Sequence, residues 1–363
     1  MSIDCIKDFP IRYNIEVWHK LNPVKIIPII ASVLLLAAIL ILLKSGVKPA
    51  ALDSSGVQET DQKYAVDYKQ IDKFVQEINV EGGKNTYLKL KENTRDLPFK
   101  EKHDLAHLLG KALYKSQGNQ AVSVCDADMS FGCYHGLFIE AINTEGIGVI
   151  KTLDQACANA GKNLYTGCQH GIGHGLVEYF GHKVADIPKA LEQCKIIQKN
   201  LLLGCSSGVF MEYFFPTSLS EDQKEYPEVN ADNPFKICKS LDPAFVNSCI
   251  YELPRLWRKT EKDINKFTAR CLGLNNATHQ KSCFRGLGYA TGNSLNPNPG
   301  FSLSICKKMP DEQKKLYCLS GATWFYSSID RSGIVDNAIN SLCKESNNEK
   351  ECKNLSNLHF DKI

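Results

Sequence analysis

The hydrophobic pattern divides the chain into one long apolar segment and a series of shorter helical ones. Residues 26–43 carry no charge, are interrupted only by Pro28 and Ser32, and lie between Lys25 and Lys44. This length is about enough to cross a bilayer core, so we expect a transmembrane anchor. The sequence then predicts a short cytoplasmic segment at 1–25, a flexible linker at 44–62 and an extracytoplasmic helical domain at 63–363.

A cleaved signal peptide is the alternative interpretation of residues 26–43. Such a peptide has a shorter apolar region with a small-residue cleavage site directly behind it. Here 25 residues precede the apolar stretch, and the sequence behind Lys44 matches a cleavage site poorly. We therefore favour a retained single-pass anchor in the cell membrane.

Behind the linker, amphipathic segments alternate with shorter and more apolar ones. The segment Ala185–Cys194 has apolar residues at helical spacing, and Cys205–Phe214 is apolar along most of its length. A cysteine lies near the end of the first segment and another near the start of the second. We therefore expect an all-α fold, an α-solenoid of about seven disulfide-stapled helical hairpins, with residues 215–234 as a loop insertion.

Fourteen of the fifteen cysteines form seven pairs, and only Cys5 stands apart. The two cysteines of a pair are 8–12 residues apart, and the second one recurs after 34–44 residues, a period typical of stacked arrays. Cysteines at this density indicate an oxidising compartment, which places the domain outside the cytoplasm. The pairs are Cys125/Cys133, Cys157/Cys168, Cys194/Cys205, Cys238/Cys249, Cys271/Cys283, Cys306/Cys318 and Cys343/Cys352.

Disulfides within each pair are the simplest connectivity, because the two cysteines face each other across a tight helical hairpin. The alternative joins each second cysteine to the first cysteine of the next repeat, and it would leave Cys125 and Cys352 without partners. A reduced cytosolic protein that binds zinc through thiolates is a further alternative. The tight C-x2-C spacing of most zinc ribbons is absent, which disfavours it.

Glycine recurs three residues beyond the second cysteine in five of the seven pairs, and Glu252 is one of the two exceptions. Glycine inside a helix costs about 1 kcal/mol relative to alanine, so its recurrence predicts that neighbouring helices approach closely there. The recurring glycines are Gly136, Gly171, Gly208, Gly286 and Gly321.

The period, the paired helices and the small residues at helix contacts resemble the Sel1-like and tetratricopeptide class of α-helical repeats over about residues 98–357. The resemblance concerns architecture. It implies a binding surface for a protein or cell-envelope partner more than it implies a particular reaction.

Six of the nine histidines lie between residues 103 and 182. Aligning the short helices makes His103, His135 and His170 equivalent, and places His107 and His174 one helical turn further on. Imidazoles at equivalent positions of adjacent packed helices can converge on one point. The other repeats have serine, tyrosine or arginine there, so the fold itself does not require histidine.

We therefore interpret His103, His107, His135, His170 and His174 as ligands of a divalent transition metal. Imidazole and carboxylate ligands, without free thiols, suit zinc, copper(II), iron or manganese. Glu178 and Glu140 are the nearest carboxylates and the candidate catalytic bases, Asp104 is a weaker candidate, and His182 is expected to lie too far along to join.

Three functions stay open at this point. A metal-dependent hydrolase or oxidase is favoured, and a non-enzymatic scaffold for a protein or envelope partner is the main alternative. Metal-free acid/base catalysis by the histidines is the third. The net charge of +3 gives no support for nucleic-acid binding. The segment His103-Asp-Leu-Ala-His107 differs from the zincin motif, and haem, nucleophile-elbow, P-loop and dinucleotide motifs are absent.

Overall fold

The computed structural model describes residues 68–197, 203–216, 227–228, 230, 232–261, 263–292, 298–329 and 341–356. These residues are helical and include no strand, which confirms the all-α prediction. The predicted anchor at 26–43, the linker, Cys5 and most of the 215–234 insertion lie outside the described residues. Within them, no helix is both long enough and apolar enough to cross a bilayer.

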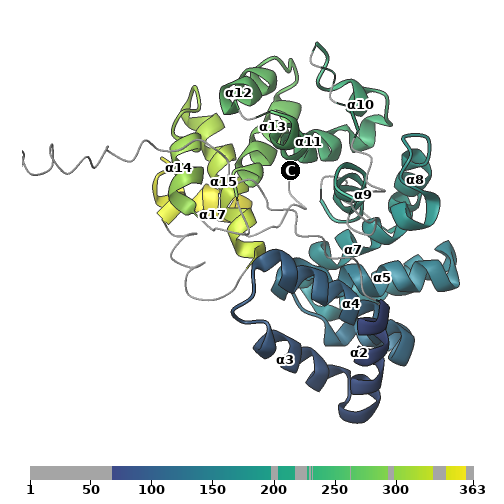
Figure 1. Ribbon diagram of the computed structural model, residues 1–363. Coiled ribbons are helices and arrows are strands. Elements are labelled where there is room, and N and C mark those ends of the chain that lie inside the picture. Colours follow the sequence, from purple (N-terminus) through teal and green to yellow (C-terminus); the bar gives the residue numbers. More distant parts are fainter. Residues whose placement is uncertain are drawn as a thin grey trace, which may run out of the picture. The chain divides into compact units, whose positions relative to one another are not determined.

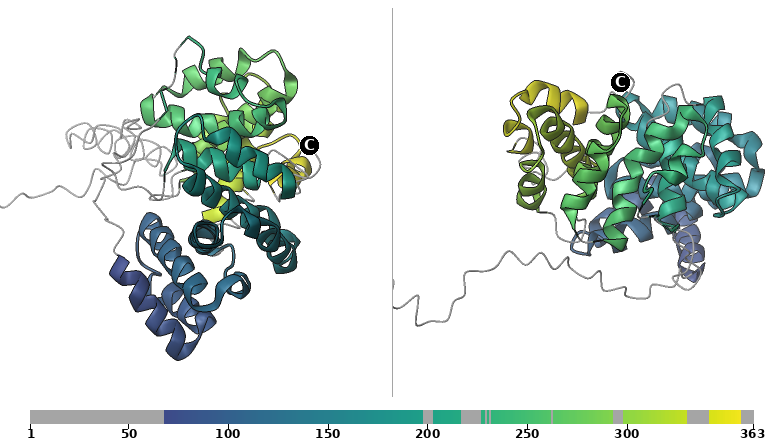
Figure 2. Two further views of the ribbon diagram at one scale, coloured as in Figure 1. Left: turned by 90° about the vertical axis from the view of Figure 1, so that its right-hand side faces the viewer. Right: turned by 90° about the horizontal axis from the view of Figure 1, so that it is seen from above.

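A series of inner helices carries the core. Each packs against the next one along the chain, and Figures 1 and 2 show that neighbours in sequence are also neighbours in space. In order they are α4 (Phe99–Gln117), α5 (Gly132–Glu145), α7 (Lys162–Phe180), α9 (Cys205–Phe214), α11 (Val246–Thr260), α13 (Ala277–Ala290), α15 (Glu312–Ile329) and α17 (Glu349–Ser356).

The outer helices pack against this series, most of them against the inner helix that follows in sequence. They are α2 (Tyr68–Glu81), α3 (Gly83–Asn93), α6 (Ile150–Ala160), α8 (Ile187–Ile197), α10 (Lys236–Lys239), α12 (Ile264–Leu272) and α14 (Pro299–Cys306). Short 3₁₀ turns connect them: η2 (Gly118–Val124), η3 (Asp128–Phe131), η4 (Ile147–Val149) and η5 (Pro243–Phe245).

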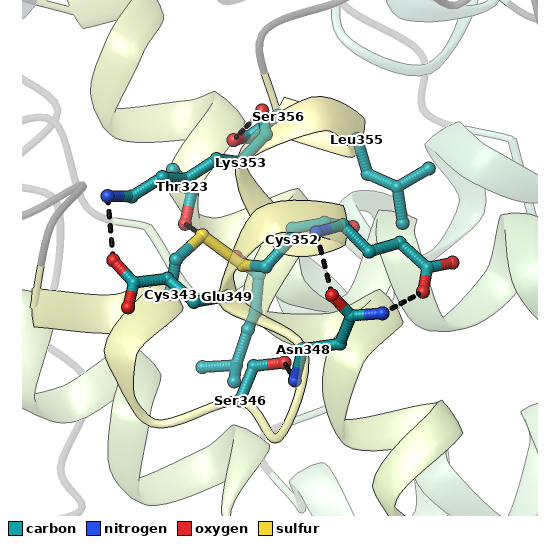
Figure 3. The surroundings of a disulfide bond; sticks show 12 residues. Thr323, Cys343, Ser346, Asn348, Glu349, Cys352, Lys353, Leu355 and Ser356 are labelled. Atoms are coloured by element: carbon teal, nitrogen blue, oxygen red, sulfur yellow. Dashed lines mark hydrogen bonds and ion pairs between the residues drawn. A yellow bond between two sulfur atoms is a disulfide. The ribbon is translucent and has the colours of Figure 1, made fainter.

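Each cysteine lies at disulfide distance from the other member of its own predicted pair, with Cα atoms 5.4–5.5 Å apart. Figure 3 shows the last bridge, Cys343–Cys352, next to Thr323 of α15, whose hydroxyl lies 3.6 Å from Cys343 Sγ. The other six bridges are Cys125–Cys133, Cys157–Cys168, Cys194–Cys205, Cys238–Cys249, Cys271–Cys283 and Cys306–Cys318.

The bridging cysteines are core residues rather than surface or ligand residues. Apart from Cys125, which is 5% exposed, they have no exposed surface, and all of them belong to the hydrophobic core. None of them is part of a candidate metal-binding group within the described residues. The disulfides therefore have a structural role and contribute about 2–3 kcal/mol each in the chain-entropy picture.

The second cysteine of each pair lies within the first two turns of its inner helix, which agrees with the predicted position near the helix start. Helix α9 begins at Cys205 itself. Most of the other inner helices begin a few residues before the cysteine. Helix α7, for example, already begins at Lys162, directly behind the left-handed Gly161.

The disulfides consequently join the sides of two packed helices rather than the two ends of a loop. This places the second cysteine inside its inner helix, next to the glycine contact with the preceding inner helix. The second cysteines that lie inside an inner helix are Cys133 in α5, Cys168 in α7, Cys249 in α11, Cys283 in α13, Cys318 in α15 and Cys352 in α17.

The recurring glycines lie where successive inner helices touch. A Cβ atom on Gly136 would come within 1.8 Å of the His107 carbonyl oxygen, and one on Gly208 within 2.0 Å of the His170 carbonyl oxygen. The later helices repeat the contact, since a Cβ on Gly286 would meet the Tyr251 carbonyl at 2.0 Å. The predicted close approach is confirmed, and only glycine allows it.

The series also returns on itself. Helix α15 contacts η3, the turn that precedes α5, although about 180 residues separate them in sequence. In Figure 1, the end of α15 lies beside the blue helices of the first part of the domain. This contact places side chains from both ends of the series around one interior region.

We predict that Gly136→Ala destabilises residues 62–363 by about 1–3 kcal/mol or more, because the new methyl group overlaps the His107 carbonyl and forces α4 and α5 apart. Denaturant unfolding of the two proteins measures the difference. Gly148→Ala is the matched control, since its Cβ would have no neighbour within 4 Å. Equal losses in both variants would contradict a packing role for Gly136.

Candidate metal centre

The five predicted histidines converge where α4, α5 and α7 meet. His103 and His107 lie one turn apart on α4, His135 lies on α5, and His170 and His174 lie one turn apart on α7. The glycine contacts bring the backbones of these helices against each other, so imidazoles on facing turns come within hydrogen-bond range of one another. Two sets of three histidines each offer ligand atoms within 4.8 Å of one another, and both sets could hold a metal ion.

The first histidine group consists of His103, His107 and His135. His107 Nε2 lies 3.1 Å from His103 Nε2 and 3.1 Å from His135 Nδ1. His103 Nδ1–H donates to the carbonyl oxygen of Met129 at 2.6 Å, which fixes its tautomer. The lone pair of the neutral His103 ring is therefore on Nε2, directed at the other two rings.

Hydrogen bonds alone cannot satisfy these three nitrogens. If His107 Nε2 carries its proton, His135 accepts on Nδ1 and must carry a proton on the buried Nε2, which has no hydrogen-bond partner among the described residues. If His107 Nε2 is unprotonated, its lone pair faces that of His103 at 3.1 Å. A cation between the three nitrogens removes both conflicts, so this donor set fits a metal ion.

The second histidine group consists of His135, His170 and His174. His174 Nε2 lies 3.0 Å from His170 Nε2, and its Nδ1–H donates to the Glu212 carboxylate at 2.6 Å. His170 Nδ1 lies 2.7 Å from the Ser207 hydroxyl. Both outer ring nitrogens are thus held by groups on α9, the usual way in which proteins orient metal-binding imidazoles.

Burial favours the uncharged form of four of these histidines. It lowers their pKa, because a charged ring would lose its hydration in the interior. Charge on neighbouring rings lowers the pKa of all four further. They are His103, His107, His135 and His170. Neutral imidazole is the form that binds metal, so the interior prepares the ligands for binding.

The turn η3, beside the first histidine group, has an unusual backbone. Met129, Ser130 and Phe131 adopt φ angles of 52°, 53° and 62°, in the left-handed region that non-glycine residues avoid. Such residues cost on the order of 1–3 kcal/mol each and cluster at functional sites. Here the turn aims the Met129 carbonyl at His103 and packs the Phe131 ring over Gly167, where a Cβ would come within 2.2 Å of it.

Glu212 is a site residue that the sequence analysis missed. It has no exposed surface, and it joins His174 to His182, whose Nε2 lies 3.3 Å from Glu212 Oε1 and 3.5 Å from Glu178 Oε2. Glu178, His182 and Glu212 form a third group that could hold a metal ion. Its position within the apolar run Val-Phe-Met-Glu-Tyr-Phe of α9 is the sequence signal that could have indicated a buried glutamate.

The raised pKa of His182 reflects two opposing effects. Burial lowers the pKa, but the hydrogen bond to Glu212 and the negative charges of Glu212 and Glu178 outweigh it. We expected His182 to lie too far along the chain from His174 to join the site. It contacts Glu212 and therefore joins the site indirectly.

Two predicted carboxylates lie elsewhere. Glu140 on α5 is 3.8 Å from Lys115, and Asp104 on α4 is 2.8 Å from Lys100. Neither belongs to any of the three groups. The expected role of Glu140 as a base has no support from these contacts, and Glu178 lies beside His182 in the third group, which adjoins the histidine cluster through Glu212.

A pocket of about 50 Å³ opens beside the second histidine group. His135 and His170 line it, whereas His103 and His107 do not. Its volume suits a few water molecules or a ligand of similar size. The rest of its wall comes from both ends of the inner series and includes Ser130, Met211, Tyr251, Glu252, Tyr289 and Trp324.

Glu252 gives this pocket a carboxylate. It occupies the position where most other repeats have glycine, and burial raises its pKa although Arg255, 3.1 Å away, opposes the shift. The buried hydroxyl of the neighbouring Tyr251 has no hydrogen-bond partner within the described part of the chain. The pocket therefore combines imidazole, carboxyl and phenol groups in a small interior space.

No protein-family model, curated protein or solved structure matches this chain. Inferences about its function therefore rest on the geometry of the histidine cluster and the pocket.

We predict that, in the presence of a chelator, the free energy of unfolding falls steeply below about pH 6.5, the ordinary pKa of histidine. In this range the unfolded chain binds up to four more protons than the folded one, because the lowered pKa values keep four buried rings neutral. The loss reaches up to about 5 kcal/mol per pH unit.

Denaturant titrations at several pH values between 8 and 5 measure this slope. The double variant His107→Gln/His135→Gln should lose about half of it, since two of the four rings are removed. Equal stability at pH 7 and pH 5.5 would show that the cluster accepts protons freely in the folded protein.

Proposed function

We propose that this chain is a metalloprotein whose five clustered histidines bind a divalent transition metal and present it to small molecules in the adjacent pocket. The observation that carries the proposal is the convergence of buried and partly buried ring nitrogens from three helices at 3.0–3.1 Å. Partners on the far side of the rings, the Met129 carbonyl, Ser207 and Glu212, direct Nε2 of His103, His170 and His174 inward.

Zinc and copper(II) are the metals that this donor set favours. Imidazole ligands suit both, and both lie near the high-affinity end of the divalent series. The cysteines of the described domain are held in disulfides and are not available as thiolates. Iron remains a weaker candidate, because the histidine groups themselves contain no carboxylate.

The pocket supports an enzymatic role on a very small substrate. A metal at the second histidine group would polarise a ligand or lower the pKa of water in the pocket. Glu252, with its raised pKa, is the pocket carboxyl best placed to exchange a proton there, in place of Glu140. The size of the pocket favours oxidative or hydrolytic chemistry on a molecule of a few atoms over cleavage of a polymer.

The setting of this function follows from the disulfides and the sequence pattern. Seven buried bridges support an oxidising compartment outside the cytoplasm. With the apolar stretch 26–43 as a membrane anchor, the helical domain is held at the cell surface or in the envelope. The serial packing of disulfide-linked hairpins supports an α-helical repeat of the Sel1-like and tetratricopeptide kind.

Metal content of residues 62–363, produced in an oxidising compartment and offered zinc, copper, iron and manganese, tests the proposal. We expect near-stoichiometric metal that the double variant His170→Ala/His174→Ala reduces, because the second histidine group loses two of its three ligands. Metal bound in equal amounts by the two proteins would refute it. If neither protein bound metal, a non-enzymatic scaffold would be the favoured function.

The role of Glu212 gives a second prediction. Glu212→Gln removes the charge that orients His174 and should weaken metal affinity 10–100-fold, as for other residues that support a ligand. Glu140→Gln is the matched control, since both glutamates lie seven residues after the second cysteine of their pair. Competition with a chelator of known affinity measures both. Equal affinities would contradict an orienting role.

A further inference from the structure

His135 belongs to both histidine groups, and this double membership determines how many ions the cluster holds. We propose that His135 bridges two divalent metal ions as an imidazolate, one ion in each histidine group. This inference rests on the proposed metal-binding function and adds a binuclear centre to it.

The two nitrogens of His135 have different surroundings. Nδ1 lies 3.1 Å from His107 Nε2, within the first group. Nε2 is buried and has no hydrogen-bond partner among the described residues, an arrangement that costs about 1–3 kcal/mol for a polar atom. The two nitrogens point away from each other in the ring plane, so one ion cannot bind both. Two ions, one at each nitrogen, use the whole ring.

Each side of the bridge offers the same pair of ligands. On one side His103 Nε2 and His107 Nε2 are 3.1 Å apart, and on the other side His170 Nε2 and His174 Nε2 are 3.0 Å apart. With the bridging ring, each ion gains three nitrogens, a donor set that leaves a fourth position for another ligand.

The proton balance is simple. Neutral His135 carries one N–H proton, and binding an ion at each nitrogen releases that proton to solvent. The resulting imidazolate is negative and lies between the two cations. The buried Glu212 carboxylate adds a second negative charge beside His174, so the repulsion between the ions is partly compensated.

The two positions differ in their access to the pocket. His170 and the bridging His135 line the pocket, whereas the histidines of α4 do not. The ion in the second group therefore faces the pocket, and the ion in the first group lies between α4, α5 and η3, away from the pocket lining. The ion outside the pocket would tune the one that faces it through the shared ring.

Copper(II) provides the test, because unpaired electrons on two ions joined by an imidazolate couple and weaken their electron paramagnetic resonance signal. We expect the full-length chain, loaded with copper(II) in detergent, to bind two ions per chain with a signal well below that of its copper content. Either outer double variant, His103→Ala/His107→Ala or His170→Ala/His174→Ala, should bind one ion with a full-strength signal.

The variant His135→Ala should lose the coupling, so that any copper it retains gives a full-strength signal. Circular dichroism and the absence of free thiols beyond Cys5 verify that each variant is folded. If His135→Ala does not fold, the wild-type signal and the two outer variants decide the question without it.

The outcomes separate this inference from the proposed function. Two ions with a full-strength signal, or one ion that either outer variant removes, would overturn the bridge and leave a histidine metal site in place. No bound copper, zinc or iron in the wild-type chain would overturn both.

Discussion

The structure depends on backbone contact between successive inner helices. At most of these contacts a glycine of one helix touches the backbone of the preceding helix, such as Gly136 on the His107 carbonyl or Gly208 on the His170 carbonyl. Any larger residue would separate the helices, and imidazoles from α4, α5 and α7 would then lie too far apart to share an ion. The packing of the fold and the convergence of the histidines are consequences of one geometric constraint.

The disulfides and the histidine cluster complement each other chemically. Oxidised cysteines close each hairpin and fill the core, which leaves nitrogen and oxygen as the strong metal ligands of the domain. Buried neutral imidazoles and the left-handed turn at Met129 destabilise the interior locally. Short covalent loops around them help the fold to hold such a site.

Much of the fold and of the histidine cluster could be predicted from local sequence. The hairpins, the cysteine pairs, the glycine contacts and the register of the five histidines all follow from periodicity within a repeat. The contact between Glu212 and His174 could not, because it depends on the rotation of α9 against α7. The pocket could not either, since Tyr289 and Trp324 reach it only after α15 returns to η3. Glu140 and Glu212 occupy the same position in their repeats, but only Glu212 reaches the histidines.

Anomalous diffraction from crystals of residues 62–363 grown with zinc or copper would test the central claim most directly, because it locates the bound element. The account predicts strong peaks between the rings of His103, His107 and His135 and between those of His135, His170 and His174. Peaks confined to surface carboxylates or exposed histidines, with none inside the cluster under saturating metal, would contradict it.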